Sequence, residues 1–408
     1  MDNKYLKNLL DKVQQNILNK WPSSLKENPD KDILCSYISS ELKDKDTEES
    51  GMSIQELILR LYYEMSGYSF LSEYLDRDDI DEININSWDD ICVCYSDGKI
   101  EKTNQCFFSP EHALDIVRRL LRQSGKVIDD STPISSGHLK NNSRISAIKS
   151  PITSSGSGVS ASIRILHPNK ITQDTLIKTD FCTSEMLMFL QTCINHGVSM
   201  LICGRTNSGK TTVMSSILST VPYTKRVYVI ESGAREIDLV KRDDKGNVLN
   251  NVVQTLSRPS DDPKRTITQE DLVETSLRFD PDVIAIGEIR NSEAFSAVEA
   301  SLTGHTVIST VHSGPGESAH SRIALLCQRR FNLGYELSLD QVRQAFPVIV
   351  FAHRNEKGER RILDITECYK RDGKYVYSTV FNYLPNSTGA MFRNYPLSKE
   401  LLSRIARF

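Results

Sequence analysis

Long apolar runs are absent from this sequence of 408 residues. The longest stretches, residues 198–203 and 347–352, are far shorter than the ~18 apolar residues that a membrane-spanning helix needs. The first residues also lack the apolar stretch of a secretory signal. We therefore expect neither a transmembrane span nor a secretory leader.

The sequence also lacks a strong charge of one sign and any paired-cysteine pattern. Lys and Arg number 50 and Asp and Glu number 53, a net charge of −3, which gives no whole-chain signal for nucleic-acid binding and leaves open a local basic patch. The cysteines number nine, with no Cys-x-x-Cys pair, so we expect reduced cytosolic thiols and no zinc site. With 39% hydrophobic and 25% charged residues, the composition is that of a folded protein with two or three domains.

The pattern along the chain predicts three parts, residues 1–50, 51–170 and 171–408. An apolar stripe at helical spacing runs through the first residues and ends at Pro22, which predicts a helix that packs on its own protein or docks on a partner. Residues 41–50 are almost entirely charged or polar. We expect them to be a linker, so that the first fifty residues form a separable helical extension.

The two larger parts differ in their secondary-structure pattern. Residues 51–170 predict a mixed α/β domain, with a hairpin, a helix capped by Ser109 and two alternating strands before a hinge at residues 167–169. From residue 171, short apolar runs alternate with helices, which predicts a parallel sheet covered on both faces. Two late turns predict an antiparallel meander at the C-terminal end. The expected strands of the parallel sheet are Met200–Cys203, residues 227–230 and 283–286, Thr306–Val311 and residues 348–351.

A P-loop is the strongest chemical motif. Residues 204–211 read G-R-T-N-S-G-K-T, between an apolar strand and a helix, which is the context that phosphate binding requires. Lys210 would neutralise the β and γ phosphates, and the Thr211 hydroxyl would hold Mg²⁺. The predicted nucleotide-binding residues are Gly204, Arg205, Thr206, Asn207, Ser208, Gly209, Lys210, Thr211 and Thr212.

Two glutamates at strand ends are candidates for activating water. Glu288 follows the apolar run 283–286, and the carboxyl end of a parallel strand faces the ligand crevice. We predict that Glu288 polarises the attacking water, as a base or through the Mg²⁺ shell; the alternative is a surface pair with Arg290. Glu231 ends another apolar strand and either holds a metal-bound water or forms a salt bridge in its loop.

Histidines and arginines complete the candidate site. His305 and His312 bracket one short strand, where they sense the γ-phosphate or orient Glu288, or else are satisfied core residues. Arg144 and Arg164 lie inside alternating strands of the preceding domain. Each is either an arginine finger that reaches the nucleotide or a cation on the exposed face of its strand.

These motifs, in this order, resemble the type II/type IV secretion ATPase superfamily, particularly its Tad-pilus CpaF-like branch. The family has a P-loop, an I-E-D box, a Walker B block ending in G-E-[IV]-R and a T-G-H…T-x-H box. They match residues 204–211, 230–231, 278–290 and 303–312 here. Ser232 stands where the family has its second acid, which leaves the metal-shell role of that loop open.

The resemblance implies a RecA-like P-loop NTPase core beneath a mixed α/β N-terminal domain. It also implies ATP and Mg²⁺ as cofactors and a homohexameric ring, with Arg144 and Arg164 reaching the phosphates as the domains close. The family is cytoplasmic and associates peripherally with the cytoplasmic membrane, where a platform protein converts its motion into pilus assembly or export. No direct nucleic-acid partner is expected. The alternatives are a type IV secretion ATPase for DNA transfer, a RecA-like nucleic-acid motor and a non-catalytic nucleotide-gated scaffold.

Overall fold

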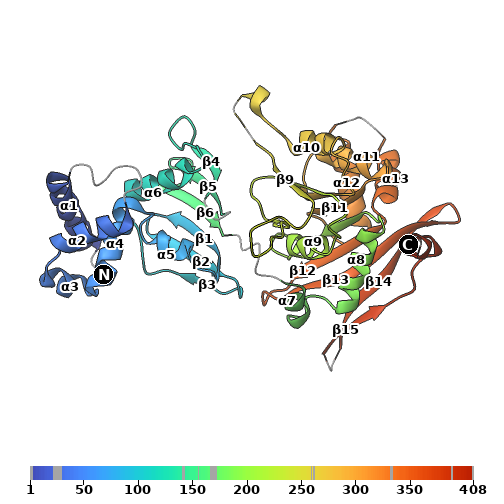
Figure 1. Cartoon of the computed structure of the whole chain (residues 1–408), viewed down its shortest axis with the longest axis horizontal. Helices are drawn as coiled ribbons and strands as arrows, with labels where there is room; N and C mark the ends of the chain where they lie inside the picture. Colours follow the sequence, from blue (N-terminus) through green and yellow to red (C-terminus); the bar gives the residue numbers. More distant parts are fainter. Residues whose placement is uncertain are drawn as a thin grey trace. The chain divides into compact units, whose positions relative to one another are not determined.

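The chain divides into two compact units, Met1–Leu166 and His167–Phe408, in a computed structural model (Figure 1). The predicted hinge at residues 167–169 lies outside the residues that the structure describes. The described residues are 3–21, 30–139, 143–154, 156–165, 172–258, 260, 262–330, 334–386 and 389–406.

Four helices at the start of unit 1 form a bundle with its own apolar core. The first helix contributes its whole apolar stripe to this core, so it packs on its own protein, one of the two predicted alternatives. The helices are α1 (Asn3–Lys20), α2 (Lys31–Glu41), α3 (Asp44–Ser50) and α4 (Ile54–Ser66). Their buried residues are Leu6, Leu9, Leu10, Val13, Ile17, Leu34, Ile38, Leu57 and Leu61.

The prediction of a linker at residues 41–50 is wrong, because α3 occupies most of that range. Asp46 is only 8% exposed and accepts hydrogen bonds from the Lys43 backbone N–H (2.8 Å) and from the Tyr5 hydroxyl (3.0 Å). The acid therefore caps its own helix and ties it to α1. The charged run is helical because one of its acids has partners within the bundle.

The rest of unit 1 is an antiparallel sheet covered on one face by α6 (Pro110–Arg122). The strand order is β3-β2-β1-β6-β5-β4. Ser109 caps α6 through the His112 backbone N–H, as predicted. Strand residues alternate between this apolar core and a polar open face. The remaining elements are α5 (Leu71–Leu75), β1 (Ile80–Ser87), β2 (Asp90–Tyr95), β3 (Ile100–Lys102), β4 (Ile134–His138), β5 (Arg144–Lys149) and β6 (Val159–Arg164).

Unit 2 is built on a sheet with strand order β15-β14-β13-β12-β7-β11-β10-β8-β9. The run from β12 to β9 is parallel, and β13, β14 and β15 add an antiparallel meander. Both features follow the prediction from the sequence. The strands are β7 (Met200–Cys203), β8 (Val227–Glu231), β9 (Val252–Leu256), β10 (Val283–Ile289), β11 (Thr306–Val311), β12 (Val348–Arg354), β13 (Arg360–Arg371), β14 (Lys374–Asn386) and β15 (Gly389–Asn394).

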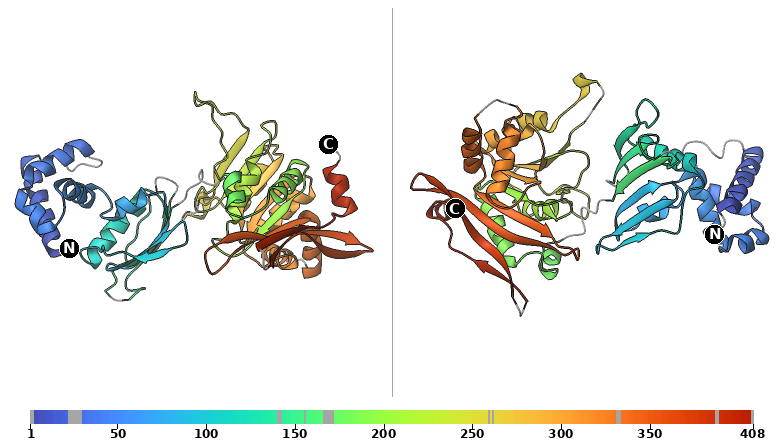
Figure 2. Two further views of the ribbon diagram at one scale, coloured as in Figure 1. Left: turned by 90° about the horizontal axis from the view of Figure 1, so that it is seen from below. Right: turned by 180° about the vertical axis from the view of Figure 1, so that it is seen from behind.

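Helices cover both faces of this sheet (Figure 2). Residues of α8 and α9 pack in one core, and residues of α11, α12 and α13 pack in the other. This two-faced cover is what makes the strands uniformly apolar. The helices are α7 (Gln173–Lys178), α8 (Ser184–Asn195), α9 (Lys210–Leu218), η2 (Pro263–Arg265), α10 (Gln269–Ser276), α11 (Glu293–Leu302), α12 (Glu317–Cys327), α13 (Tyr335–Ala345) and α14 (Lys399–Ile405).

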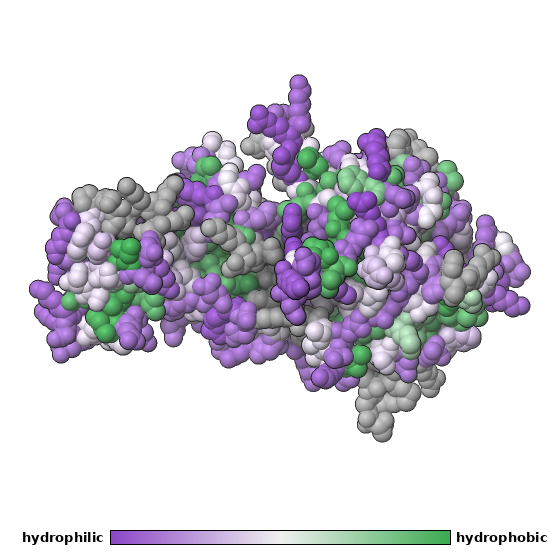
Figure 3. All heavy atoms as spheres, viewed as in Figure 1, coloured by the Kyte–Doolittle hydropathy of each residue, from purple (hydrophilic) through white to green (hydrophobic). Residues whose placement is uncertain are grey.

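The surface seen in Figure 3 is mostly hydrophilic, with apolar side chains scattered over it. A segment that carries η2 projects from the body of unit 2 (Figure 1), and its Lys264 and Arg265 side chains are exposed. In the described part of the chain, every helix is too short or too polar to cross a membrane.

Candidate functional site

Four parallel strands bring the predicted site residues to one edge of the sheet in unit 2. Val311 in β11 lies opposite Cys203 in β7, and Ile286 in β10 lies opposite Ile230 in β8. The carboxyl ends of all four strands therefore meet at this edge, where open α/β sheets bind ligands. The P-loop follows β7 and Glu231 ends β8. Glu288 lies near the end of β10, and His312 follows β11.

The backbone of the P-loop curls through the left-handed region at three positions. Gly204 has φ 149°, Asn207 has φ 60° and Gly209 has φ 89°. A Cβ at Gly204 would overlap the carbonyl oxygen of Ala352, and one at Gly209 would lie 2.6 Å from the Phe181 ring. Glycine is thus required at both positions for two reasons: neighbouring atoms leave no room for a Cβ, and the backbone has a positive φ. The curled loop, followed at once by the N-terminus of α9, has the form of a phosphate-binding nest.

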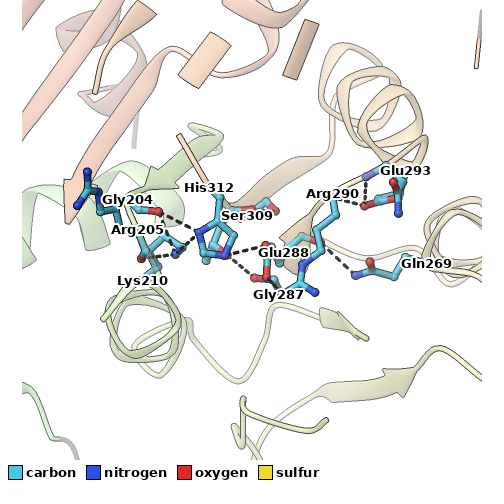
Figure 4. Close-up of polar contacts among 12 residues, drawn as sticks. Gly204, Arg205, Lys210, Gln269, Gly287, Glu288, Arg290, Glu293, Ser309 and His312 are labelled. Carbon is cyan, nitrogen blue, oxygen red and sulfur yellow. Dashed lines mark hydrogen bonds and ion pairs between the residues drawn. The ribbon is translucent and has the colours of Figure 1, made fainter. Parts of the chain in front are cut away.

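Lys210 lies beside Gly204 and Arg205, on the other side of His312 from Glu288 (Figure 4). Its ammonium group donates to the carbonyl oxygens of Gly204 (3.2 Å) and Arg205 (2.9 Å), and its Nζ lies 3.4 Å from His312 Nδ1. The lysine is only 7% exposed. A nearly buried ammonium group at the start of α9, beside the curled loop, is placed to attract the negative charge of a phosphate chain.

His312 connects Lys210 to Glu288. His312 Nε2 lies 3.1 Å from Glu288 Oε1, and His312 Nδ1 lies 3.2 Å from the Gly204 carbonyl oxygen. Burial, together with the positive charge of Lys210, lowers the pKa of His312 from its usual 6.5. The imidazole is therefore neutral at pH 7, with one nitrogen toward the P-loop and the other toward the carboxylate.

Glu288 also forms an ion pair with Arg290, so the predicted surface pair exists beside the contact to His312. The strand end that carries Glu288 is held by its neighbours. Thr310 donates its hydroxyl proton to the Gly287 carbonyl (2.7 Å), and Gln269 donates to the Glu288 carbonyl (3.2 Å). The carboxylate is thus fixed at the site, with groups facing both of its oxygens.

Glu231 is the most buried acid of the site, with 3% exposure. Its Oε1 accepts hydrogen bonds from the backbone N–H groups of Glu236 (2.6 Å) and Ile237 (2.9 Å), and its Oε2 has no partner among the described residues. Burial raises the pKa of Glu231 from 4.5 to about 7. It makes no salt bridge within the described part of the chain, unlike the loop-acid alternative; instead it is a desolvated carboxyl group with one free oxygen.

The other P-loop residues differ in their exposure. Ser208 is buried and its hydroxyl has no hydrogen-bond partner among the described residues, whereas Arg205 and Thr206 are exposed. Thr211 and Thr212 are half-buried in the first turn of α9. These groups fit a polyphosphate, because the loop leaves a curled row of N–H groups and an orphaned hydroxyl where the anion would lie. No group of three or more His, Cys, Asp or Glu that could hold a metal exists among the described residues.

His305 is not brought to the site. It precedes β11, whereas His312 follows the same strand. A strand of six residues is ~20 Å long, so His305 lies at the opposite edge of the sheet from the P-loop. Its backbone N–H donates to Ala300. The prediction that both histidines act on the nucleotide therefore finds support at His312 alone.

Arg144 and Arg164 lie in unit 1 and are direct partners across β5 and β6. Cross-strand partners share a face, so the two guanidinium groups belong to the open face of that sheet. Arg164 is exposed and Arg144 is half-buried. Their contact with a nucleotide remains a prediction.

Sequence reasoning missed two residues that contact the motifs. Thr310 was visible within the T-x-H motif, where its side chain holds Gly287. Arg360 donates to the Asn207 side chain of the P-loop at 2.7 Å. It had no sequence signal, because 153 positions separate it from its partner.

The sheet order, the P-loop and the acids at neighbouring strand ends define a RecA-like P-loop NTPase core. The model of the family described as "Type II/IV secretion system protein" matches residues 113–352, more than half of the chain. The chain belongs to this family.

Relatives by sequence support that placement. The uncharacterized protein MJ0900 of Methanocaldococcus jannaschii is 29% identical over 296 residues, or 72% of this chain and 51% of that protein. The putative conjugal transfer protein Rv3659c of Mycobacterium tuberculosis is 26% identical over 340 residues, or 79% and 90%. The type IV secretion system protein PtlH of Bordetella pertussis is 29% identical over 191 residues, or 45% and 53%. The match thus spans about half the length of MJ0900 and of PtlH.

Solved structures show the same fold. The ATPase DotB of Legionella pneumophila superposes with a TM-score of 0.50 and 19% identity, covering 72% of this chain and 77% of that one. DotB of Yersinia pseudotuberculosis gives 0.52 and 15%, covering 76% and 80%. At these identities the likeness concerns the fold.

Proposed function

We propose that this chain is an ATPase that couples ATP hydrolysis to domain motion and so powers secretion or pilus assembly at the cytoplasmic membrane. The observation that carries the proposal is the chain of contacts from the P-loop through Lys210 and His312 to Glu288. It links the group that would hold phosphate to a carboxylate at the end of the neighbouring β10 strand. Membership in the secretion family supplies the process that the hydrolysis would drive.

ATP and Mg²⁺ are the cofactors of this proposal. The P-loop N–H groups and Lys210 would hold the β and γ phosphates, and the Thr211 hydroxyl would be the protein's ligand to Mg²⁺. Magnesium keeps several waters and takes few protein ligands beside the phosphates. One hydroxyl therefore suffices, although the described residues offer no cluster of three metal-binding side chains. When bound, the metal would neutralise charge on the phosphates.

The two glutamates divide the chemistry between them. Glu231 is the better proton acceptor, since its pKa is raised to about 7 and its Oε2 has no partner among the described residues. A base whose pKa lies near the working pH is the most effective. Glu288 is engaged by Arg290 and His312, so we assign it to orienting the attacking water and the metal shell. From the sequence alone, Glu288 is the residue predicted to polarise the water, and Glu231 is a candidate to hold a metal-bound water.

The family resemblance further supports a homohexamer that works as a cytoplasmic ring on a membrane platform protein. In such a ring, Arg144 and Arg164 would reach the nucleotide phosphates from the open face of their sheet as the units close. Their shared register in β5 and β6 supports a joint role. The order of the four sequence motifs favours the Tad-pilus CpaF-like branch.

A type IV secretion motor for DNA transfer is the second candidate. Similarity to a protein named a putative conjugal transfer protein, over 79% of this chain, favours it. A nucleotide-gated scaffold is less well supported. The exposed Ser232 stands where the family has an acid, but the buried Glu231 beside it is still available as a base.

The test is steady-state ATP turnover with Mg²⁺, measured across protein concentration together with light-scattering mass. Turnover should rise with assembly. Glu288→Gln should bind ATP but hydrolyse it at least ~10²-fold more slowly, while its rate still rises with pH through about 7, since Glu231 remains. Glu231→Gln should be as slow and lose that rise. Normal turnover in either variant would overturn the assignment of its role, and no turnover by the wild type in any assembled state would count against the motor.

A further inference from the structure

Two arginines face each other beside the P-loop. Arg354 ends β12 and Arg360 begins β13, and the two are direct partners in the antiparallel pair. Like charges directly opposite on neighbouring strands destabilise a sheet. A bound anion near such a pair would relieve this repulsion.

The register places this pair on the same face of the sheet as α9. Ala352 and Ile362 are partners two residues before Arg354 and two residues after Arg360, and both pack in the core that contains α9. Side chains two residues apart on a strand share a face. The arginines thus lie one step beyond this core, at the carboxyl edge where the P-loop begins.

The P-loop lies directly against this hairpin. Gly204 is in close contact with the Ala352 carbonyl on β12, and Arg360 Nη2 donates to Asn207 Oδ1 at 2.7 Å. Because β12 lies between β13 and β7 in the sheet, the side chain of Arg360 reaches past β12 to meet the loop. Arg354 is on the strand that it passes.

Asn207 is the non-glycine residue of the P-loop with a left-handed backbone, φ 60°. Its amide oxygen accepts from Arg360, so its amide N–H₂ group is turned the other way. An Asn held in this conformation by a guanidinium fixes the curl of the loop. Arg360 therefore acts on the phosphate site through Asn207.

Arg354 has a different place. It is half-buried, and its enclosed Nε–H has no hydrogen-bond partner among the described residues. An enclosed N–H donor without a hydrogen-bond acceptor is costly. This cost falls if a bound anion accepts a hydrogen bond from the Arg354 side chain.

We propose that Arg354 contacts the phosphate chain of the bound nucleotide directly and that Arg360 is a positioning residue that holds the P-loop through Asn207. The proposal rests on the nucleotide binding proposed above. It adds a cationic wall from β12 and β13 to the site that the motif residues form.

The experiment measures binding of Mg²⁺–ATP to the full chain, and thermal melting with and without it. Arg354→Gln should bind ATP about tenfold or more weakly, as expected for a lost hydrogen bond to a charged group. Without nucleotide it should melt no lower than the wild type, because the opposed charge is gone. The stabilisation by ATP should shrink. A purely structural arginine would instead lower the melting temperature without nucleotide.

Arg361→Gln is the matched control. Arg361 is the next residue on β13, lies on the opposite face and stacks on Tyr383 with its guanidinium 4.9 Å from the ring centroid. Its loss removes the same charge and should lower stability, yet leave ATP affinity unchanged. Arg354→Lys serves if Arg354→Gln does not fold, and it should restore part of the affinity.

The role of Arg360 is tested by a double-mutant cycle with Asn207→Ala. The two single variants should weaken ATP binding to a similar extent, and the double variant should be no weaker than either. Additive losses would overturn the action through Asn207.

Failure of this proposal is distinguishable from failure of the proposed function. If the wild type binds ATP, Lys210→Ala does not and Arg354→Gln binds like Arg361→Gln, the arginine wall is refuted while nucleotide binding stands. If the wild type and Lys210→Ala both fail to bind ATP, both proposals fall.

Discussion

Glu231→Gln changes how the stability of unit 2 depends on pH. Glu231 keeps its proton up to a pKa of about 7 when folded, against 4.5 ordinarily. Between these two values the unfolded chain has released the proton and the folded chain still holds it. Stability therefore falls as pH rises from 4.5 to about 7, and it is level above that. Since each pKa unit corresponds to about 1.36 kcal/mol, the total loss is about 3 kcal/mol.

Glutamine cannot titrate, so the variant lacks this loss. Its amide would bury an N–H₂ group at the position of Oε2, which has no partner among the described residues, at a cost of about 1–3 kcal/mol, but that cost does not vary with pH. The informative quantity is therefore the difference in unfolding free energy between wild type and variant, followed from pH 5 to pH 9. We expect the wild type to lose about 3 kcal/mol relative to Glu231→Gln, most of it below pH 7.

The assay must report on unit 2. Both tryptophans, Trp21 and Trp88, lie in unit 1, so tryptophan emission would follow the wrong unit. Hydrogen-exchange labelling of peptides from β8 and β10 over a urea series measures the relevant transition. Asp238→Asn, an exposed acid on the same loop, is the control and should leave the pH dependence as it is. A wild-type-to-variant difference that stays constant over this pH range would refute the desolvated carboxyl group.

Two other predictions concern the phosphate loop and the N-terminal bundle. Lys210→Ala should abolish stabilisation of unit 2 by ATP, because the phosphate charge is left uncompensated; a melting shift with ATP equal to that of the wild type would contradict the role of the lysine. Leu61→Ala should destabilise the bundle by about 2–5 kcal/mol, since the side chain is fully buried in its core. Trp21 emission in a Trp88→Phe background would measure this loss, and a loss below about 1 kcal/mol would argue against a separate core.

Much of unit 2 could be predicted because its strands are short, apolar and covered on both faces. The runs around Met200–Cys203 and Thr306–Val311 have no other plausible place than a buried parallel sheet. The P-loop was equally clear, since its chemistry demands particular residues at particular spacings. The position of Glu231 and Glu288 at the carboxyl edge of the sheet could be predicted because both lie at the ends of such strands.

The features that could not be predicted from the sequence depend on contacts between residues far apart in the chain. The run at residues 41–50 has a linker's composition, but Asp46 is held by Tyr5 across the bundle. His305 looked equivalent to His312, yet strand direction alone sends one of them to the far edge. Arg360 meets Asn207 only because β13 lies two strands from β7. Composition and local spacing do not show which distant segments lie side by side.

The loop after β8 makes the acidity of Glu231 depend on backbone position. Two N–H groups, from Glu236 and Ile237, donate to the same carboxylate oxygen, and both favour the ionised form against burial. If this short turn moved away, the carboxyl group would hold its proton at still higher pH and cease to accept one from water. The turn thus behaves as an interlock, in which the carboxyl group is ionised near neutral pH, and so can accept a proton, only while its own backbone is closed.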